Sequence, residues 1–378
     1  MQLMGIERAT LERLLPGLDA ALCEESLLDR ENPDSKRVLK SFRESGGPAL
    51  LVPSRHLGLG ATAVDSLRVL RAIGSRSPSL AVATTMHQFS IASLVEAEKV
   101  ADPRVWMLLE AIATQRLLVS SGFAEGRAGQ SILLPSIDAT VSGHSVILNG
   151  SKKPCSLAQS MDLMTVSIVI PNSAGAMEFA VAVVPAYSPG LSVQPFWNNS
   201  VLAAAESHEV VLTDVRVPLD LVVRTGVVSG DELDPVQTAG FIWFELLMSA
   251  SYLGMATALA ERVYESGRGS VEDQMTVVVE LEGAMNSLIG VAHRLDDEQP
   301  RDTNMLLSVL LSRYACQDAI TRASQLSLEI LGGTAFMSSH ESTYLGACIS
   351  ALKFHPPQRI RSASSVTSAL RGAPLILG

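Results

Sequence analysis

The sequence predicts an α+β protein in which a small β domain lies between two helical domains. Apolar residues recur at helical spacing through residues 1–116 and again through residues 226–378. Between them, residues 117–225 are rich in β-branched side chains and are interrupted by Gly, Asn and Ser, a pattern typical of short strands. Because helices stand on both sides of a single β segment, the order of the domains narrows the choice of fold more than any one residue does.

The composition is that of a globular chain with a large core. The 378 residues are 47% hydrophobic, which is enough for two or three domains. A net charge of −10 without a basic run argues against nucleic acid and anionic membranes as partners, and a polyanionic ligand would need a local basic spot. The longest uncharged run, 179–205, contains three prolines and therefore does not predict a membrane-spanning helix.

The cysteines and the N-terminus both predict a cytoplasmic protein. The four cysteines have neither metal-ligand nor redox spacing, so we expect reduced thiols and no metal site. Charged residues at Glu7 and Arg8 interrupt any signal-peptide pattern at the start of the chain.

The N-terminal domain is predicted to be a set of packed helices. Leucines at helical spacing indicate a first helix over Glu7–Leu27. Two further helices with apolar faces are predicted over Ser66–Gly74 and Ala81–Val100.

The middle domain is predicted to contain several short strands. Val119–Ala124 and Ser145–Leu148 are apolar and β-branched, and Asn149–Gly150 after them is a strong hairpin-turn signal, because both turn positions need a positive φ. His208–Pro218 alternates over its first half and ends in proline, which indicates another strand. The polar, glycine-containing segment Thr225–Asp234 is interpreted as the linker to the last domain.

The C-terminal domain is predicted to be an up-down bundle of long helices. Phe241–Val263, Val271–Asp296 and Asn304–Leu331 each carry a core-facing apolar stripe. Gly332–Gly333 follows the third of these, as expected at the C-terminal end of a helix. A four-helix bundle is the architecture that such helices favour.

Two segments of the β domain resemble the flavin-binding strands of the acyl-CoA dehydrogenase superfamily. Ser121–Glu125 resembles the start of that family's "T-E-P-G-x-G-S-D" loop, and Leu148–Ser156 resembles its "L-N-G-x-K-x-[WF]-I-[TS]" strand. The strand His208–Pro218 is similar to "x-V-x-F-x-D-V-x-V-P". The resemblance extends along nearly the whole chain and implies an acyl-CoA dehydrogenase-like fold, with FAD between the β domain and the C-terminal bundle.

The resemblance also implies which strand residues contact the flavin. Phe123, Ala124 and Ser156 occupy the matching positions, and the Ser156 hydroxyl is expected to hydrogen-bond the flavin at N5. Pro154 stands where the family usually has an aromatic residue that covers the ring. The loss of that stacking surface predicts weaker flavin binding.

A second group of residues is expected, by the same resemblance, to serve the FAD of a neighbouring subunit. Arg268 matches the arginine that holds the pyrophosphate, and a guanidinium suits bidentate phosphate contact. Glu329, Gly332 and Gly333 match "Q-I-x-G-G", which packs on the adenine side, with Glu329 in place of the usual glutamine. The resemblance therefore implies a homodimer or a homotetramer.

The position of the usual catalytic base is altered. Pro356 stands where the family has the glutamate that abstracts the α-proton of an acyl-CoA, and proline has no ionisable group. Glu245, a lone carboxylate in a very apolar helix, is either a base with a raised pKa or the buried partner of an arginine. His355 is either an acid–base residue or an ordinary turn residue.

Three functions remain open at this point. The first is an FAD-dependent dehydrogenase acting on an acyl thioester carried by CoA or an acyl carrier protein, in a specialised pathway. The second is a flavin monooxygenase of the same fold, which needs no α-proton base. The third is a binding or non-redox protein that has lost dehydrogenase activity.

Overall fold

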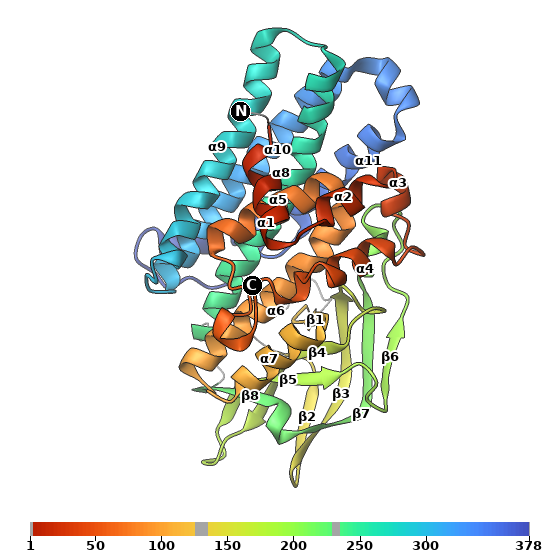
Figure 1. Ribbon diagram of the computed structural model, residues 1–378. Helices are drawn as coiled ribbons and strands as arrows, with labels where there is room; N and C mark the ends of the chain where they lie inside the picture. The colour runs from red at the N-terminus through yellow and green to blue at the C-terminus, as the bar shows by residue number, and fades with distance from the viewer. Residues whose placement is uncertain (1–2, 125–134, 229–234, 378) are drawn as a thin grey trace.

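The computed structural model describes residues 3–124, 135–228 and 235–377. The N-terminal and C-terminal helices pack together at one end of the molecule, and two β-sheets form the other end (Figure 1). The predicted α+β, acyl-CoA dehydrogenase-like fold class is thereby confirmed, with N-terminal helices, a middle sheet region and a C-terminal helical bundle.

The N-terminal region contains more and shorter helices than predicted. The expected helix over Glu7–Leu27 is instead two helices, followed by a third that begins at Leu27, and Gly17 after Pro16 adopts φ 77° where the first one has ended. The helices of this region are α1 (Gly5–Leu14), α2 (Leu18–Cys23), α3 (Leu27–Arg30), α4 (Arg37–Glu44), α5 (Ala63–Arg76), α6 (Pro78–Val100) and α7 (Val105–Gln115).

The β domain is built from two four-stranded sheets that enclose an apolar core of their own. One sheet has the order β1-β4-β5-β8, with β1 parallel to β4, and the other has the order β2-β3-β7-β6. The strands are β1 (Val119–Gly122), β2 (Asp138–Ser142), β3 (Ser145–Cys155), β4 (Leu163–Pro171), β5 (Met177–Pro185), β6 (Leu191–Gln194), β7 (His208–Pro218) and β8 (Val222–Val228).

Two local predictions in the β domain are wrong. Asn149–Gly150 does not form a hairpin turn but lies inside β3, where the register with β7 shifts. The Asn149 side chain instead bridges to β7, since its amide donates to Asp214 at 3.1 Å and its carbonyl accepts from the Asp214 amide at 2.8 Å. The first part of the predicted linker Thr225–Asp234 belongs to β8, and residues 229–234 lie outside the described residues.

The C-terminal helices follow the sequence prediction closely. They are α8 (Pro235–Ser266), α9 (Val271–Asp296), α10 (Thr303–Ser338), α11 (His340–Ile349) and α12 (Arg359–Ala369). Gly332 has φ 77° and ψ 175°, so the helical path breaks at the predicted glycine pair before a further helical segment follows.

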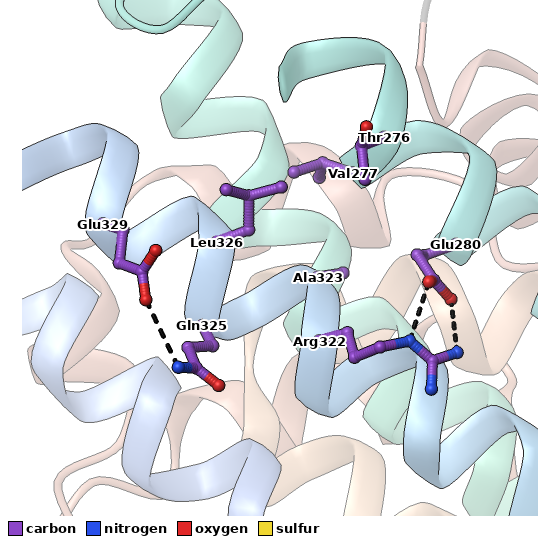
Figure 2. Close-up of a pocket in the computed structure, with 8 residues that line it drawn as sticks. All are labelled: Thr276, Val277, Glu280, Arg322, Ala323, Gln325, Leu326 and Glu329. Carbon is purple, nitrogen blue, oxygen red and sulfur yellow. Dashed lines mark hydrogen bonds and ion pairs between the residues drawn. The ribbon is translucent and has the colours of Figure 1, made fainter. Parts of the chain in front are cut away.

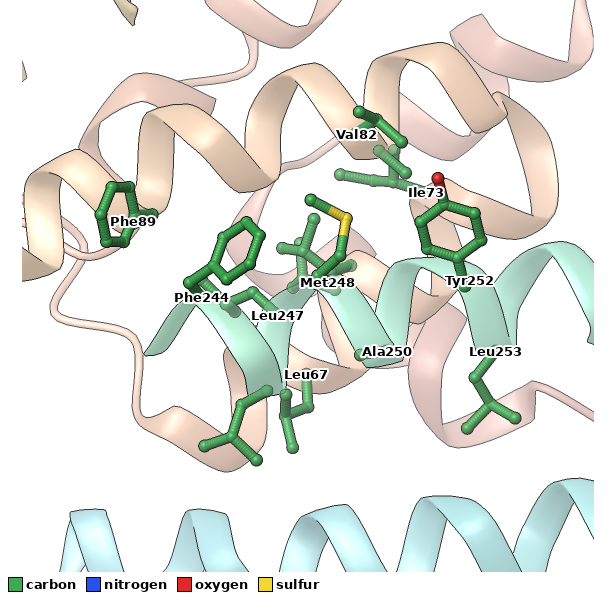
Figure 3. Close-up of a cluster of buried hydrophobic side chains, with 14 of the residues drawn as sticks. Leu67, Ile73, Val82, Phe89, Phe244, Leu247, Met248, Ala250, Tyr252 and Leu253 are labelled. Atoms are coloured by element: carbon green, nitrogen blue, oxygen red, sulfur yellow. The ribbon is translucent and has the colours of Figure 1, made fainter. Parts of the chain in front are cut away.

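Helix α8 is the central element of the helical end, and its apolar side chains pack against α5 and α6 (Figure 3). It is long and apolar enough to cross a membrane, but 94% of its most apolar window is buried within the protein, as in a core helix. The backbones of α5 and α8 approach closely because two glycines lie at the crossing. A Cβ at Gly254 would stand 2.1 Å from the Arg71 carbonyl oxygen, and one at Gly74 would stand 2.2 Å from that of Ser251.

Candidate active site

The ends of β1 and β3 bring the three strand residues predicted to contact flavin into one place. The Lys153 amide donates to the Ala124 carbonyl at 3.3 Å, and the Ser120 hydroxyl donates to the Ser156 carbonyl at 2.6 Å. Phe123 therefore lies on the same edge of the β domain as Ser156. The Ser156 hydroxyl is 3.0 Å from the Ser207 hydroxyl, so it already has one polar neighbour.

This edge has features that fit a flavin. The Ser121 hydroxyl is buried on β1 and has no hydrogen-bond partner in the described part of the chain. A buried hydroxyl without a partner is costly, and a bound group with polar ring atoms would remove that cost. Phe123, Ala124 and Ser156 would hold such a ring through backbone groups and one hydroxyl. Glu125, the last residue of the resembling segment, lies outside the described residues.

A line of aromatic rings runs from this edge to the C-terminal domain. Phe123 lies edge-on to Phe89 of α6 at 5.3 Å between ring centroids, and Phe89 lies edge-on to Phe244 of α8 at 5.8 Å. Phe244 in turn lies 6.4 Å from the ring of His355. Phe89 and Phe244 are drawn side by side in Figure 3. The aromatic line therefore connects the predicted flavin contacts with His355 through an apolar region.

His355 is held by a tyrosine of α8. Its Nε2 lies 2.8 Å from the hydroxyl of Tyr252, which is fully buried and has no other polar partner in the described chain. The hydroxyl therefore donates to Nε2, and the proton of the neutral imidazole stays on Nδ1. Burial and the nearby charge of Arg313 lower the pKa of His355 to about 3, so the ring is uncharged at neutral pH. His355 is half-buried and presents an N–H donor that has no partner among the described residues.

Glu245 is paired with an arginine in the interior, which is one of the two interpretations left open by the sequence. Its carboxylate lies 2.8 Å from Nε of Arg313 on α10, and both side chains are completely buried. Neither oxygen of Glu245 accepts a well-directed hydrogen bond from the residues that the structure describes. Burial raises the pKa of Glu245 to about 7, while the charge of Arg313 acts in the opposite direction.

The residues predicted to serve a neighbouring subunit lie together at another place on the bundle. Arg268 donates to the Leu331 carbonyl, directly before Gly332 and Gly333. Glu329 lines a groove of about 260 Å³ between α9 and α10, where its carboxylate accepts from Gln325 at 3.3 Å (Figure 2). The structure thus brings these four predicted residues into one neighbourhood.

The two groups of predicted residues lie far apart along α8. Helix α8 rises by about 33 Å between Phe244 and Ser266, and Arg268 follows just after its end. The strand ends meet the first third of α8 through Phe89 and Phe244, and His355 lies against its middle at Tyr252. Arg268 and the glycine pair lie beyond its C-terminal end. A cofactor that contacts both groups would have to lie between two subunits.

Several residues of the site were not predicted. Tyr252 follows Glu245 by seven positions, which places both on the same face of α8, and this spacing was the available signal. Arg313 is a lone charge within the apolar stripe of α10. The sequence did not identify Phe89 and Phe244 as site residues, because aromatic residues in an apolar helix are usually part of the hydrophobic core.

A comparison with known sequences shows a relative over the whole chain. The isobutylamine N-hydroxylase of Streptomyces viridifaciens is 44% identical over 378 residues, covering 99% of this chain and 100% of that protein. A comparison with protein-family models gave no match.

Solved structures with the same fold include oxygen-using and FMN-containing proteins. The nitrososynthase of Micromonospora carbonacea var. africana matches with a TM-score of 0.83 at 20% identity, covering 98% of both chains. FMN-bound TdsC of Paenibacillus sp. A11-2, a dibenzothiophene monooxygenase, matches at 0.80 and 17% identity, covering 98% of this chain and 99% of that one. KijD3 in complex with FMN and a dTDP-linked amino sugar matches at 0.79 and 19%, covering 97% and 94%. With 44% identity along its whole length, the chain belongs to the family of this N-hydroxylase, and it shares the acyl-CoA dehydrogenase-like fold of the solved structures.

Proposed function

We propose that the protein is a flavin-dependent monooxygenase that hydroxylates the nitrogen of a small primary amine. The observation that carries this proposal is the 44% identity to an isobutylamine N-hydroxylase along essentially the whole of both chains. The site supports the same conclusion, because Pro356 replaces the usual α-proton base and monooxygenation needs no such base. An apolar region lined by Phe89, Phe123 and Phe244 suits a short alkyl group.

The reaction balances with dioxygen and an external reductant. Reduced flavin, when bound, activates dioxygen and supplies two electrons, and together with two protons this converts R–NH₂ and O₂ into R–NH–OH and water. One N–O bond forms, one N–H bond and the O–O bond break, and the second oxygen atom leaves as water. An external reductant must therefore supply two electrons, and we expect a reductase that provides reduced flavin.

The residues of this chain bind the reactants and exclude water. The three phenyl rings keep the region around the reacting nitrogen dry, which strengthens the polar contacts made there. Nδ1 of His355 carries an N–H that would donate to a bound group and hold a proton for the oxygen atom that leaves as water. The Ser156 hydroxyl and the backbone around Ala124 would orient the flavin ring.

Acyl-thioester dehydrogenation remains a second candidate with less support. Its substrate would be carried by CoA or an acyl carrier protein, and Glu245 would have to take the α-proton. The ion pair of Glu245 with Arg313 and the complete burial of both side chains make such a role less favourable. The relatives named above favour oxygenation, and they also weaken the hypothesis of a non-redox binding protein.

The two enzyme hypotheses differ in how the flavin is reduced. Protein loaded with FMN or FAD under anaerobic conditions is expected to keep its visible flavin bands when short-chain acyl-CoA thioesters are added. In air, with reduced flavin supplied by a reductase, isobutylamine is expected to yield a hydroxylamine detectable by mass spectrometry. Bleaching of the flavin by a thioester would refute the monooxygenase proposal in favour of dehydrogenation.

We propose further that the active enzyme is a homodimer or a dimer of such dimers. The proposal is supported by the distance along α8, because Arg268 can reach a flavin only in another subunit. Arg268→Ala is expected to weaken flavin binding about tenfold or more, because a charge-assisted contact to phosphate is lost. Flavin fluorescence titration measures this change, and light scattering checks the subunit number.

The matched control removes an exposed arginine that does not line the groove between α9 and α10. Arg13 is exposed on α1 and is paired with Asp65 at 2.7 Å. Arg13→Ala is expected to leave the flavin affinity within twofold of the wild-type value. Equal flavin affinities for the two variants, or a 40 kDa monomer at micromolar concentration, would contradict the shared site.

A further inference from the structure

One buried guanidinium fixes the turn that carries His355. Nη1 of Arg313 donates to the Pro357 carbonyl at 2.6 Å, and Nη2 donates to the carbonyls of His355 at 2.7 Å and Leu352 at 3.1 Å. Tyr314 adds a hydrogen bond to the same Pro357 carbonyl at 3.1 Å. The backbone on both sides of the imidazole is thus anchored to α10.

The same turn is fixed from α8 at two points. Glu245 pairs with Arg313, and Tyr252 holds the imidazole of His355. An α-helix turns about 100° per residue, so positions seven apart lie on one face. One face of α8 therefore contacts both Arg313, which hydrogen-bonds the backbone of the turn, and the imidazole ring of His355.

The ion pair is not explained by stability. Removing two charges from water costs several kcal/mol per ion, and apolar side chains of similar volume are often as stabilising or more so. This pair also lacks well-directed hydrogen bonds to the carboxylate, although its atoms are 2.8 Å apart. The burial of this ion pair costs free energy, and its arginine hydrogen-bonds a turn of the candidate active site. The pair is therefore better explained by the residues that it positions.

We infer that Glu245 and Arg313 are positioning residues that hold His355 against the aromatic line. In this orientation, oxidation of the flavin is expected to yield hydroxylamine rather than hydrogen peroxide. This inference rests on the proposed function for its predicted effect on coupling, which is the ratio of hydroxylamine formed to flavin oxidised. The positioning of His355 by the pair does not depend on that function. The carboxylate holds the guanidinium, the guanidinium holds three carbonyls, and Tyr252 then leaves only Nδ1 of the imidazole available.

The charge of Arg313 has a second effect on His355. The ionisable groups around the imidazole are Tyr252 and Glu245 from α8, Arg313 from α10 and Lys353 from its own turn, whose ammonium lies over the Phe354 ring. Burial first, and Arg313 second, lower the pKa of His355. The imidazole therefore stays neutral over the working pH range.

The test replaces the pair with apolar side chains of similar volume, as Glu245→Leu with Arg313→Met. Histidine labelled with ¹³C gives one ring signal per histidine, and the signal missing in His355→Gln identifies His355. In the double variant this signal is expected to shift and broaden, and its titration is expected to move to higher pH, because the charge of Arg313 lowers the pKa of His355. The ratio of hydroxylamine formed to flavin oxidised is expected to fall about five- to tenfold.

Two further variants keep the test decisive. Arg313→Lys retains the charge but not the three carbonyl contacts, so the His355 signal should shift while its titration stays low; this variant decides the question if the double variant does not fold. Glu7→Gln is the control, because it breaks a buried pair with Arg71 that does not touch the turn, and coupling should not change.

The results separate this inference from the proposed function. An unchanged His355 signal and titration, with coupling within twofold of wild type, would overturn the positioning role. Should the wild-type protein form no hydroxylamine at all, the proposed function fails, and the ¹³C signal of His355 still decides whether the pair positions the ring.

Discussion

His355→Gln is expected to lower the rate of amine hydroxylation by about 100-fold. Glutamine still accepts the hydrogen bond from Tyr252, so the packing of the turn is retained. Its amide can donate a hydrogen bond as the imidazole does, but it cannot give up and take back a proton. A positioned proton donor or acceptor typically contributes a factor of about 10² to 10⁴ in rate. The reduced flavin should still react with oxygen, and hydrogen peroxide should form in place of the hydroxylamine.

The readouts are the kcat for hydroxylamine and the yield of peroxide per flavin oxidised. His293→Gln is the matched control, because His293 is exposed on α9 at a distance from the site, and its kcat should stay within twofold. A His355→Gln enzyme that retains normal kcat and coupling would show that His355 is only a turn residue.

His87→Leu is expected to be the most destabilising of the single substitutions considered. His87 is completely buried on α6, where Nδ1 accepts from the Val119 amide at 2.9 Å and Nε2 donates to the Pro48 carbonyl at 3.0 Å. Leucine leaves both backbone groups unpaired at about 1–3 kcal/mol each. The expected loss is about 4 kcal/mol, or a fall of roughly 5 °C in the unfolding midpoint.

The effect of His87 should depend on pH. Burial lowers the pKa of His87 from 6.5 to about 4, so between these values the unfolded state binds more protons than the folded state. The stabilisation from neutral His87 is therefore full above pH 6.5 and is lost as the pH falls toward 4. The gap between wild type and His87→Leu should narrow by about 2 kcal/mol between pH 7.5 and pH 5. Thermal unfolding at both pH values measures this, and a gap that widens on acidification would contradict it.

The fold was predictable because its signals are long and regular. Residues Val271–Asp296 of α9 were predicted to the residue, since an apolar stripe of that length has no competing interpretation. Local signals of two residues were less reliable. Asn149–Gly150 has the composition of a hairpin turn, but pairing of Asn149 with Asp214 on β7 makes it part of a continuous strand instead.

The site was only partly predictable because its residues meet through the tertiary structure. Glu245 was a candidate because it is a lone carboxylate in an apolar helix, and His355 because it precedes Pro356 at the position of the usual base. The sequence does not show that Arg313 lies between them. Arg313 is distant from both along the chain, and only the packing of α10 against α8 brings the three together. The spacing of Glu245 and Tyr252 was visible, yet its meaning depends on the position of the turn at residue 355.

The most direct test of N-hydroxylation is the origin of the oxygen atom in the product. The wild-type protein, supplied with enzymatically reduced flavin, is incubated with isobutylamine under ¹⁸O₂ and the product is analysed by mass spectrometry. The account predicts a hydroxylamine that carries one ¹⁸O atom, no label when ¹⁸O is supplied in water, and no product without reduced flavin. Product labelled from water, or oxidation of an acyl thioester without oxygen incorporation under the same conditions, would contradict it.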